Sequence, residues 1–392
     1  MNKLLLSLLC LISVNVPFIK INKVETVYTT VVENDTIIKN AKSAILIDAS
    51  TGNVLYEKNA NEKLSPASMT KIMTMKLVLD SIDNNELSFD EILTTSKHAS
   101  SMGGSQVFLS VGEKMKCVDL FKSMVIASAN DAAVVLAEKV SGSEDNFVRK
   151  MNLEASKIGC KNTNFINCTG LPENNHYTTC YDMALIAKSL LNNYEDIIIP
   201  FTKTYEDYIR TDTKKPFWLV NTNKMIKMNN GIDGLKTGWT NEAGYCITTT
   251  MKKGDMRLIC VIMNAETPTL RNNDALSLLN YGFDNFEIIK LKDENDEILC
   301  ESDVMLYPSK YHIVTSEPVY YLKNKDIKLG EVKYEVKLDR SKIRNLCTLD
   351  VGVLNVYIDD KLYTSVSLKI SEKTTKSKFN DVIYQIFISL FK

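Results

Sequence analysis

The sequence of 392 residues predicts an α+β domain followed by a small all-β domain. Three observations support this fold class. Strand-like segments open and close the region up to residue 285, helical patterns fill its middle, and short alternating segments dominate after about Phe286. Strands at both ends of the first region indicate a sheet that pairs those ends. The chain is also long enough to build a large hydrophobic core.

The first elements follow from apolar runs and turn residues. Apolar runs at Ala44–Ala49 and Val54–Lys58 flank the turn 50–53 and predict a β-hairpin. A helical pattern then covers residues 69–82, and because it is apolar on most sides we expect a buried central helix. Further helical patterns cover residues 118–127, 131–140, 181–191 and 270–281. A second hairpin is predicted from Ile247–Met251 and Arg257–Met263.

The all-β domain is expected over residues 286–370, with alternating segments at 319–322, 331–338 and 353–370. The last segment, 371–392, begins with a polar linker and ends in apolar residues at helical spacing. These are Phe379, Val382, Ile383, Ile386, Phe387, Leu390 and Phe391. Such an amphipathic helix is too short to span a bilayer but can lie in the membrane interface as an anchor. The alternative is a helix that docks on the protein's own core.

The amino terminus has a different character from the rest of the chain. Lys3 precedes the apolar run 4–16, which is shorter than a membrane span and fits the apolar region of a signal peptide. We therefore expect a signal peptide at residues 1–20, export across the cytoplasmic membrane, and a first domain at 21–285. A buried amino-terminal strand or helix is the alternative. No clear cleavage site is present.

Composition excludes several classes of function. The net charge is −1 without a long run of one sign, so no nucleic-acid partner is expected. The nine cysteines form no CxxC pair and the three histidines lie far apart, so we expect no metal and no cofactor. Cys160, Cys168 and Cys180 are close enough in sequence for one disulfide, although free buried thiols fit equally well. His176 precedes a helix in a loop and is interpreted as structural.

Ser68 and Lys71 are the first candidates for chemistry. Residues three apart share one face of a helix, so the Lys71 amine can reach the Ser68 hydroxyl. A serine is a poor nucleophile until a base removes its proton. Lysine can be that base only where burial or a second cation lowers its pKa. By itself this spacing is weak evidence.

Two further motifs carry suitable side chains. Ser128 and Asn130 lie in a break between two helices, where a serine can relay a proton and an amide can bind substrate. Lys236 and Thr237 lie just ahead of a strand pair and can bind a carboxylate. Gly238 then allows close approach of a substrate backbone. Each motif alone could be a turn, a helix cap or a strand edge.

The three motifs together, in this order, resemble the penicillin-binding serine peptidases and serine β-lactamases, whose signatures are SxxK, SxN and KTG. The segments SPASMTK, SANDAA and DGLKTGWT are similar to the D-alanyl-D-alanine carboxypeptidases of low molecular mass in particular. The resemblance covers residues 40–290 strongly. It implies an antiparallel sheet with helices on both sides.

The resemblance also implies a role for each motif residue. Ser68 attacks the carbonyl between two terminal D-alanines, Lys71 is the general base, and Ser128 passes the proton to the leaving D-alanine. Asn130 holds the substrate or Lys71. The substrate carboxylate binds Lys236 and Thr237 beside Gly238, and the backbone N–H groups of Ser68 and Trp239 form the oxyanion hole. Trp239 stands where several relatives carry His or Phe, so this side chain is expected to alter the rim of the pocket.

The expected function is a serine carboxypeptidase that trims the pentapeptide stems of peptidoglycan, at the outer face of the membrane, in cell-wall synthesis and shape. β-Lactam antibiotics are expected to acylate Ser68 as inhibitors. Two alternatives remain: a β-lactamase, or a penicillin-sensing or wall-binding protein with weak catalysis. Residues 171–175 do not match the Glu-x-x-Leu-Asn element of class A β-lactamases.

Overall fold

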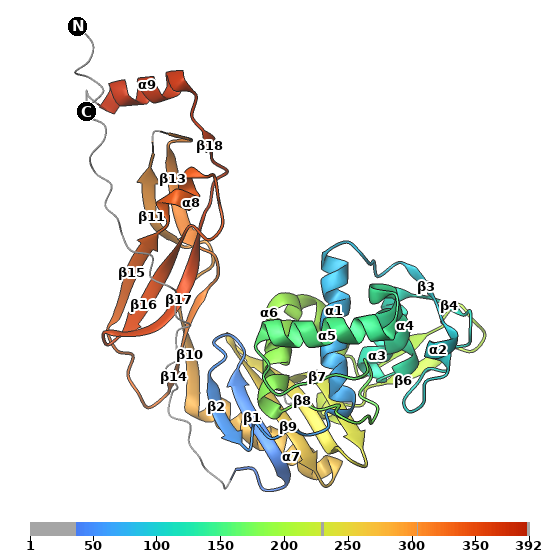
Figure 1. Ribbon diagram of the computed structural model, residues 1–392. Coiled ribbons are helices and arrows are strands. Elements are labelled where there is room, and N and C mark those ends of the chain that lie inside the picture. Colours follow the sequence, from blue (N-terminus) through green and yellow to red (C-terminus); the bar gives the residue numbers. More distant parts are fainter. Residues whose placement is uncertain (1–36, 229–230, 304, 390–392) are drawn as a thin grey trace. The chain divides into compact units, whose positions relative to one another are not determined.

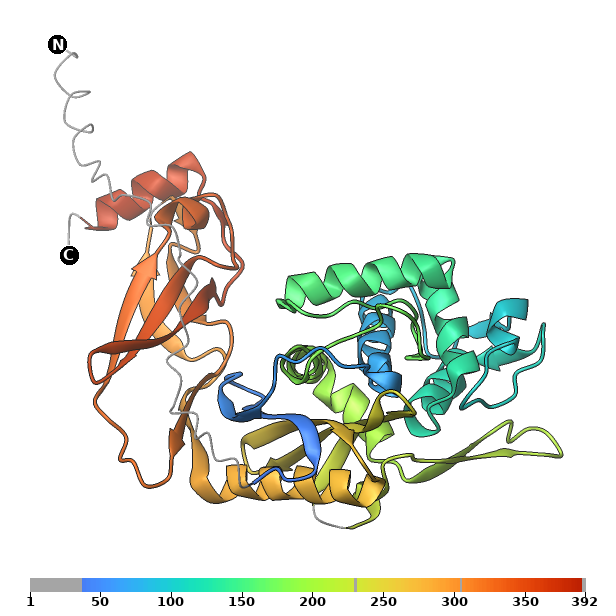
Figure 2. The same ribbon diagram turned by 60° about the horizontal axis from the view of Figure 1, so that its bottom comes forward.

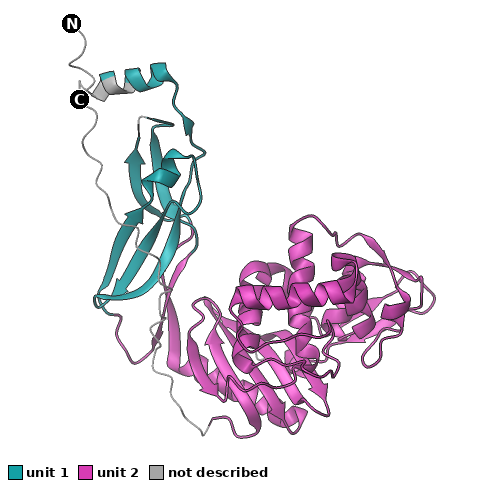
Figure 3. Cartoon of the chain, in the orientation of Figure 1, with its two compact units in different colours: residues 1–27, 295–317, 330–392 teal, residues 28–294, 318–329 magenta. Residues whose placement is uncertain are grey.

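The computed structural model describes residues 37–228, 231–303 and 305–389, which divide into two compact units (Figure 3). The larger unit contains the described residues up to Glu294 together with Pro318–Leu329. The smaller unit contains Asn295–Glu317 and the described residues from Gly330 onward. The expected signal peptide at 1–20 lies outside the described residues.

The larger unit is built on a five-stranded sheet in the order β2-β1-β9-β8-β7, in which every neighbouring pair is antiparallel. The strands are β1 (Ala41–Asp48), β2 (Val54–Lys58), β7 (Ile232–Thr240), β8 (Gly244–Lys253) and β9 (Met256–Ala265). Strand β1 pairs with β9, so the sheet joins the two ends of this region as predicted. Both predicted hairpins are present, and β7 is the edge strand.

Helices cover both faces of this sheet, as the family resemblance implied (Figure 1, Figure 2). Alternate residues of β1 show why: Ile45 and Ile47 enter the hydrophobic core on one face, whereas Ala44 and Leu46 enter the core on the other. Helix α7 (Pro268–Asn285) covers the second face, and Thr267 caps its first turn through Leu270 N.

The first face carries the remaining long helices of the larger unit. They are α1 (Lys71–Asp83), α3 (Cys117–Ile126), α4 (Asn130–Ser141), α5 (Glu144–Ile158) and α6 (Cys180–Thr202). Helix α1 is buried along most of its length, in agreement with its apolar composition. Helix α6 continues beyond the predicted end because it bends at Tyr194, where φ is −140°, and then resumes.

Short elements complete the larger unit. They are η1 (Ala67–Thr70), α2 (Lys97–Ser100), η2 (Lys224–Met228), and the two-stranded pairs β3 (Ile92–Thr94) with β4 (Lys114–Lys116), β5 (Glu206–Ile209) with β6 (Phe217–Val220), and β10 (Phe286–Lys292) with β14 (Val319–Asn324). Strand β10 follows α7 directly, and its first residue, Phe286, packs in the core beneath α7. The larger unit therefore continues through β10 to Glu294.

The smaller unit is built on a five-stranded antiparallel sheet in the order β11-β13-β17-β16-β15. Its elements are β11 (Glu297–Ser302), β12 (Leu306–Tyr307), β13 (Lys310–Thr315), β15 (Val332–Leu338), α8 (Arg340–Arg344), β16 (Gly352–Ile358), β17 (Lys361–Ile370), β18 (Thr375–Lys376) and α9 (Phe379–Ser389). Among the helices of the described chain, none combines the length and the apolar character that crossing a membrane requires.

Candidate active site

Ser68 lies in the short helix η1, one turn before α1, and is half-buried. The preceding residue, Ala67, has a φ of +45°, an unfavourable conformation for a residue with a side chain. Lys71 is the first residue of α1, and its Nζ lies 3.0 Å from Ser68 Oγ. The spacing of three residues therefore places an amine against the hydroxyl, the contact that a serine nucleophile and its base require.

Lys71 is fully buried, and burial lowers its pKa from 10.5 to about 7 although the nearby Asp131 carboxylate favours the charged form. Its Nζ donates hydrogen bonds to Asn130 Oδ1 and to the carbonyl oxygen of Thr169, each at 2.6 Å. A neutral amine has two hydrogens and one lone pair. With both hydrogens held in this way, the lone pair is left for the proton of Ser68.

Acylation of Ser68 is therefore expected to depend on pH through Lys71. Only the neutral amine can accept a proton, so the rate should rise about tenfold per pH unit below pH 7 and level off above about pH 8. The measurement is the second-order rate constant for acylation by a fluorescent penicillin between pH 5 and 9. A rate that is flat from pH 5 to 7 would contradict this role for Lys71.

Ser128 and Asn130 lie at the break between α3 and α4, as predicted. Ser128 has a φ of +63°, and its buried Oγ has no hydrogen-bond partner among the described residues. Strained backbone and an unsatisfied buried hydroxyl are both frequent at functional sites. The Asn130 amide is held by the protein: Oδ1 accepts from Lys71, and Nδ2 donates to the Gly103 carbonyl at 2.7 Å. Asn130 therefore fixes the Lys71 amine.

Lys236, Thr237 and Gly238 lie inside the edge strand β7, and not ahead of a strand pair as the sequence suggested. The position inside a strand arises because these residues pair with Thr248, Ile247 and Cys246 of β8. Burial, followed by repulsion from Lys71 and Arg271, holds the pKa of Lys236 well below its usual range. The charged form of Lys236 is therefore unfavourable in the empty site. The negative charge of a bound carboxylate would offset this unfavourable burial of the ammonium group.

The backbone of β7 approaches Ser68 closely at Gly238. A Cβ atom there would lie 2.8 Å from the carbonyl oxygen of Pro66 and 3.2 Å from the backbone nitrogen of Ser68. The next residue, Trp239, is 53% exposed, and its ring centroid lies 5.9 Å from that of Tyr245. Close contact between β7 and η1 thus brings together the two segments that carry the expected oxyanion-hole donors, Ser68 and Trp239.

The loop 167–170 supplies contacts that the motifs did not reveal. Thr169 binds the Lys71 amine through its carbonyl, over a separation of 98 residues. Gly170 has a φ of +83°, and a Cβ atom there would lie 1.8 Å from the carbonyl oxygen of Ala67. Asn167 Oδ1 fixes the loop by accepting from the backbone N–H groups of Thr169 (3.1 Å) and Gly170 (2.7 Å). Only the turn-forming residues Asn and Gly in this segment signal such a loop in the sequence.

Two further residues were missed by sequence reasoning. Asp131 is buried, and one of its carboxylate oxygens accepts from Val107 N at 3.1 Å and Leu109 N at 3.0 Å, which fixes the loop that meets Asn130. Arg271 of α7 is buried behind Cys246, whose carbonyl oxygen accepts from its Nη1 at 3.3 Å. Its positive charge acts on Lys236 and reinforces the attraction for an anion.

The remaining polar candidates have structural roles. His176 Nε2 lies 2.9 Å from Thr70 Oγ1, its Nδ1 accepts from Ile166 N at 3.2 Å, and burial lowers its pKa to about 4. The ring is therefore neutral at physiological pH and supports η1. Every described cysteine is free, including Cys160, Cys168 and Cys180. Within the described residues no group of three or more His, Cys, Asp or Glu is arranged to hold a metal ion.

The chain is similar to known proteins over the segment that carries these residues. A family model described as D-alanyl-D-alanine carboxypeptidase (Peptidase_S11) matches residues 29–267. The chain is 49% identical to D-alanyl-D-alanine carboxypeptidase DacF of Bacillus subtilis over 299 residues. These aligned residues are 76% of each of the two chains. It is 36% identical to D-alanyl-D-alanine carboxypeptidase DacC of Escherichia coli over 259 residues, and this alignment covers 64% of this chain and 63% of that protein.

Solved structures of penicillin-binding proteins are also similar to this chain. Penicillin binding protein 5 from Haemophilus influenzae matches 86% of this chain and 98% of its own, with a TM-score of 0.69 and 27% identity. Penicillin-Binding Protein D2 from Listeria monocytogenes, in its ampicillin-bound form, matches 62% of this chain and 97% of its own, with a TM-score of 0.55 and 32% identity. Both likenesses rest on sequence as well as on fold.

Proposed function

The chain belongs to the D-alanyl-D-alanine carboxypeptidase family, and on this premise we propose that Ser68 is the nucleophile through which it removes the terminal D-alanine of peptidoglycan stem peptides. The observation that carries the assignment is the 3.0 Å contact between Ser68 Oγ and a buried amine whose pKa is about 7. Such an amine is substantially neutral at physiological pH and can act as a base.

In the proposed acylation step, Lys71 takes the proton of Ser68 as Oγ attacks the carbonyl carbon of the penultimate D-alanine. The oxygen of that carbonyl becomes negative and is stabilised by the backbone N–H groups of Ser68 and Trp239. The close packing of Gly238 on Ser68 supports this pairing of donors. The free carboxylate of the substrate binds Lys236 and Thr237, with Arg271 behind them.

The leaving D-alanine needs a proton on its nitrogen when the peptide bond breaks. The unpartnered hydroxyl of Ser128 is the candidate to relay it from Lys71, because this Oγ is buried and has a free donor and acceptor among the described residues. Hydrolysis of the acyl-enzyme is the same step in reverse with water in place of the amine, so Lys71 can also activate that water.

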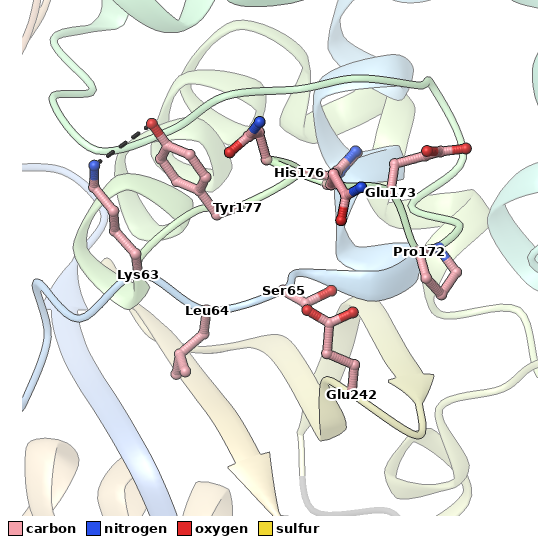
Figure 4. A pocket seen from close by; sticks show the side chains of 10 residues that line it. Lys63, Leu64, Ser65, Pro172, Glu173, His176, Tyr177 and Glu242 are labelled. Carbon is pink, nitrogen blue, oxygen red and sulfur yellow. Dashed lines mark hydrogen bonds between the residues drawn. The ribbon is translucent and has the colours of Figure 1, made fainter.

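Penicillin is expected to acylate the same serine, because its strained amide and carboxylate mimic the end of the stem peptide. The alternatives, a β-lactamase and a penicillin sensor, differ in the fate of the acyl-enzyme. Glu173, the acid in the loop after Gly170, is exposed and points away from the neighbouring cavity, so it does not offer a buried base for rapid deacylation (Figure 4).

The test is the release of D-alanine from a muropeptide that ends in D-Ala-D-Ala. The purified protein should release D-alanine, and prior treatment with penicillin should stop release in proportion to a covalent adduct that mass spectrometry maps to the peptide containing Ser68. Rapid turnover of penicillin would favour a β-lactamase. A stable adduct without any release of D-alanine from the untreated protein would favour a sensor.

We further propose export by the amino-terminal segment 1–20 and attachment to the outer face of the membrane through α9. The support lies in the exposed apolar side chains of α9. Phe379, Ile383, Tyr384 and Phe387 are between 51% and 78% exposed, at helical spacing on one face. A helix that docked on its own core would bury these side chains, whereas a lipid surface would take them up.

Changing this face to serine (Phe379→Ser, Ile383→Ser and Phe387→Ser together) is therefore expected to release the protein from membranes while D-alanine release in solution is unchanged. The measurement is co-sedimentation with vesicles of phosphatidylglycerol and phosphatidylethanolamine. Asn380→Ser on the same helix is the control and should sediment like the wild type. Undiminished sedimentation of the triple variant would contradict the proposed anchor.

A further inference from the structure

The Lys71 amine is oriented by two oxygen atoms that belong to different segments of the chain. Asn130 Oδ1 and the carbonyl oxygen of Thr169 each lie 2.6 Å from Lys71 Nζ. Asn130 is itself held by the loop that follows α2, because its Nδ2 donates to the Gly103 carbonyl at 2.7 Å. The direction of the amine therefore depends on where two segments are held: α2 with the loop after it, and the loop 167–170.

Glu144, the first residue of α5, contacts both segments through its two carboxylate oxygens. Oε2 accepts from Nε2 of His98 in α2 at 2.7 Å, and Oε1 accepts from the backbone N–H of Cys168 at 3.0 Å. His98 lies five residues before Gly103, and Cys168 lies directly before Thr169. One side chain thus joins the two segments that supply or hold the partners of the proposed base.

The contact between Glu144 and Cys168 lies inside the protein. Cys168 is fully buried, and the Glu144 side chain is only 14% exposed. Burial holds the pKa of the Cys168 thiol well above its usual range, so the thiol stays protonated, and it also hydrogen-bonds Glu144. The carbonyl oxygen of Cys168 accepts from Thr74 Oγ1 of α1 at 2.7 Å. Cys168 is therefore held by α5 and by α1, and the next residue, Thr169, binds Lys71.

From these contacts we propose that Glu144 is a positioning residue for the acylation of Ser68. Its Oε1 fixes the loop whose carbonyl binds the Lys71 amine, and its Oε2 ties this loop to α2. Without the carboxylate, the N–H of Cys168 has no acceptor among the described residues. A buried N–H without an acceptor is unfavourable, so we expect the loop to shift until water reaches it, which releases the Lys71 amine. The proposal rests on the proposed role of Lys71 as the base of a carboxypeptidase.

Three substitutions of Glu144 separate the reach of the side chain from its charge. Glu144→Gln keeps the length and an oxygen that can accept from Cys168 N, so acylation by a fluorescent penicillin should stay within about 2-fold of the wild type. Glu144→Asp keeps the charge but is one methylene group shorter, and Glu144→Ala removes both properties. These two variants should be acylated about 10-fold more slowly, a fraction of the 10²- to 10⁴-fold that a general base contributes.

The same loss should appear in D-alanine release as a lower kcat, with KM changed much less, because the proposed carboxylate site is untouched. A merely structural role would lower the thermal stability without this division between kcat and KM, so thermal unfolding is measured beside the rates. His98→Ala removes only the contact with α2, through an imidazole that is 50% exposed, and should cause a smaller loss than Glu144→Ala.

Asp145→Ala is the matched control for the loss of a negative charge at this position. Asp145 is an exposed acid in the same first turn of α5, and it forms no hydrogen bond or ion pair with a described residue. Both acids interact with the positive end of the helix dipole, so this variant shares any effect of that interaction. It should be acylated at the wild-type rate.

Wild-type rates in the glutamine variant, together with slow acylation of folded Glu144→Asp, would support the positioning role even if the alanine variant does not fold. A folded Glu144→Ala or Glu144→Asp protein with the wild-type rate would overturn it. An equal loss in the glutamine and alanine variants would overturn it as well, and in each of these cases the carboxypeptidase function stands. If the wild type neither reacts with penicillin nor releases D-alanine, the proposed function itself fails and the positioning role with it.

Discussion

Replacing Lys71 by methionine is expected to slow acylation of Ser68 by about 10²- to 10⁴-fold, the range over which general bases contribute to catalysis. Methionine matches the length of the lysine chain but cannot accept a proton. The serine hydroxyl then has to react without its base, although the proposed carboxylate site at Lys236 is unchanged. The loss should therefore appear in kcat, with KM for the stem peptide changed much less.

The measurement is the acylation rate with penicillin together with D-alanine release. Ser68→Ala is the reference for complete loss, because it removes the nucleophile itself. Methionine also leaves the Asn130 and Thr169 oxygens without their donor, which costs about 1–3 kcal/mol for a buried acceptor. Thermal unfolding must therefore show that the variant is folded at the assay temperature. A folded Lys71→Met protein that acylates at the wild-type rate would exclude Lys71 as the base.

Gly170→Ala is expected to produce the second large effect, a loss of about 10²- to 10³-fold in acylation, similar to the removal of one oxyanion-hole donor. The added Cβ would lie 1.8 Å from the Ala67 carbonyl oxygen and 2.9 Å from the Ser68 backbone nitrogen. Neither backbone atom can stay in place. Because the Ser68 N–H is one of the two expected oxyanion donors, its displacement weakens stabilisation of the transition state more than it weakens substrate binding.

Gly142→Ala provides a matched control for this variant. Gly142 has a φ of +77°, close to the +83° of Gly170, but a Cβ at Gly142 meets no atom within 4 Å. Both alanine variants therefore carry the cost of a left-handed backbone, about 1 kcal/mol, and only Gly170→Ala adds the clash. Stability should fall in both variants, and activity only in Gly170→Ala. Equal activities of the two folded variants would show that the 170 loop does not position Ser68.

Local spacing explains which parts of the site could be predicted. Ser68 and Lys71 are three residues apart, and a helical turn of that length brings their side chains together whatever the rest of the fold does. Ser128 and Asn130 are close for the same reason, at a break between two helices. Lys236 and Thr237 were predicted as binding residues, but their place inside the edge strand β7 was not predicted, since Lys and Gly, two of the three residues of KTG, are depleted in strands.

Contacts between segments that are far apart in the sequence explain which parts of the site could not be predicted. Thr169 binds Lys71 through a backbone carbonyl, which every residue type possesses, so its identity gave no signal. Arg271 lies on α7, which covers one face of the sheet, yet its charge acts on Lys236 in β7. Such residues are recognised only after the chain has folded.

The order of residues was enough to establish the α+β class, the hairpins and helices of the larger unit and the family, and to predict Ser68 as the nucleophile with Lys71 as its base. These depend on periodicity and on neighbours along the chain. The pKa of Lys71, the partners of Asn130 and the close packing of Gly170 and Gly238 on Ser68 became known only from the folded chain. They could not be read earlier because burial, electrostatic potential and steric contact are sums over atoms that are near in space and far apart in sequence.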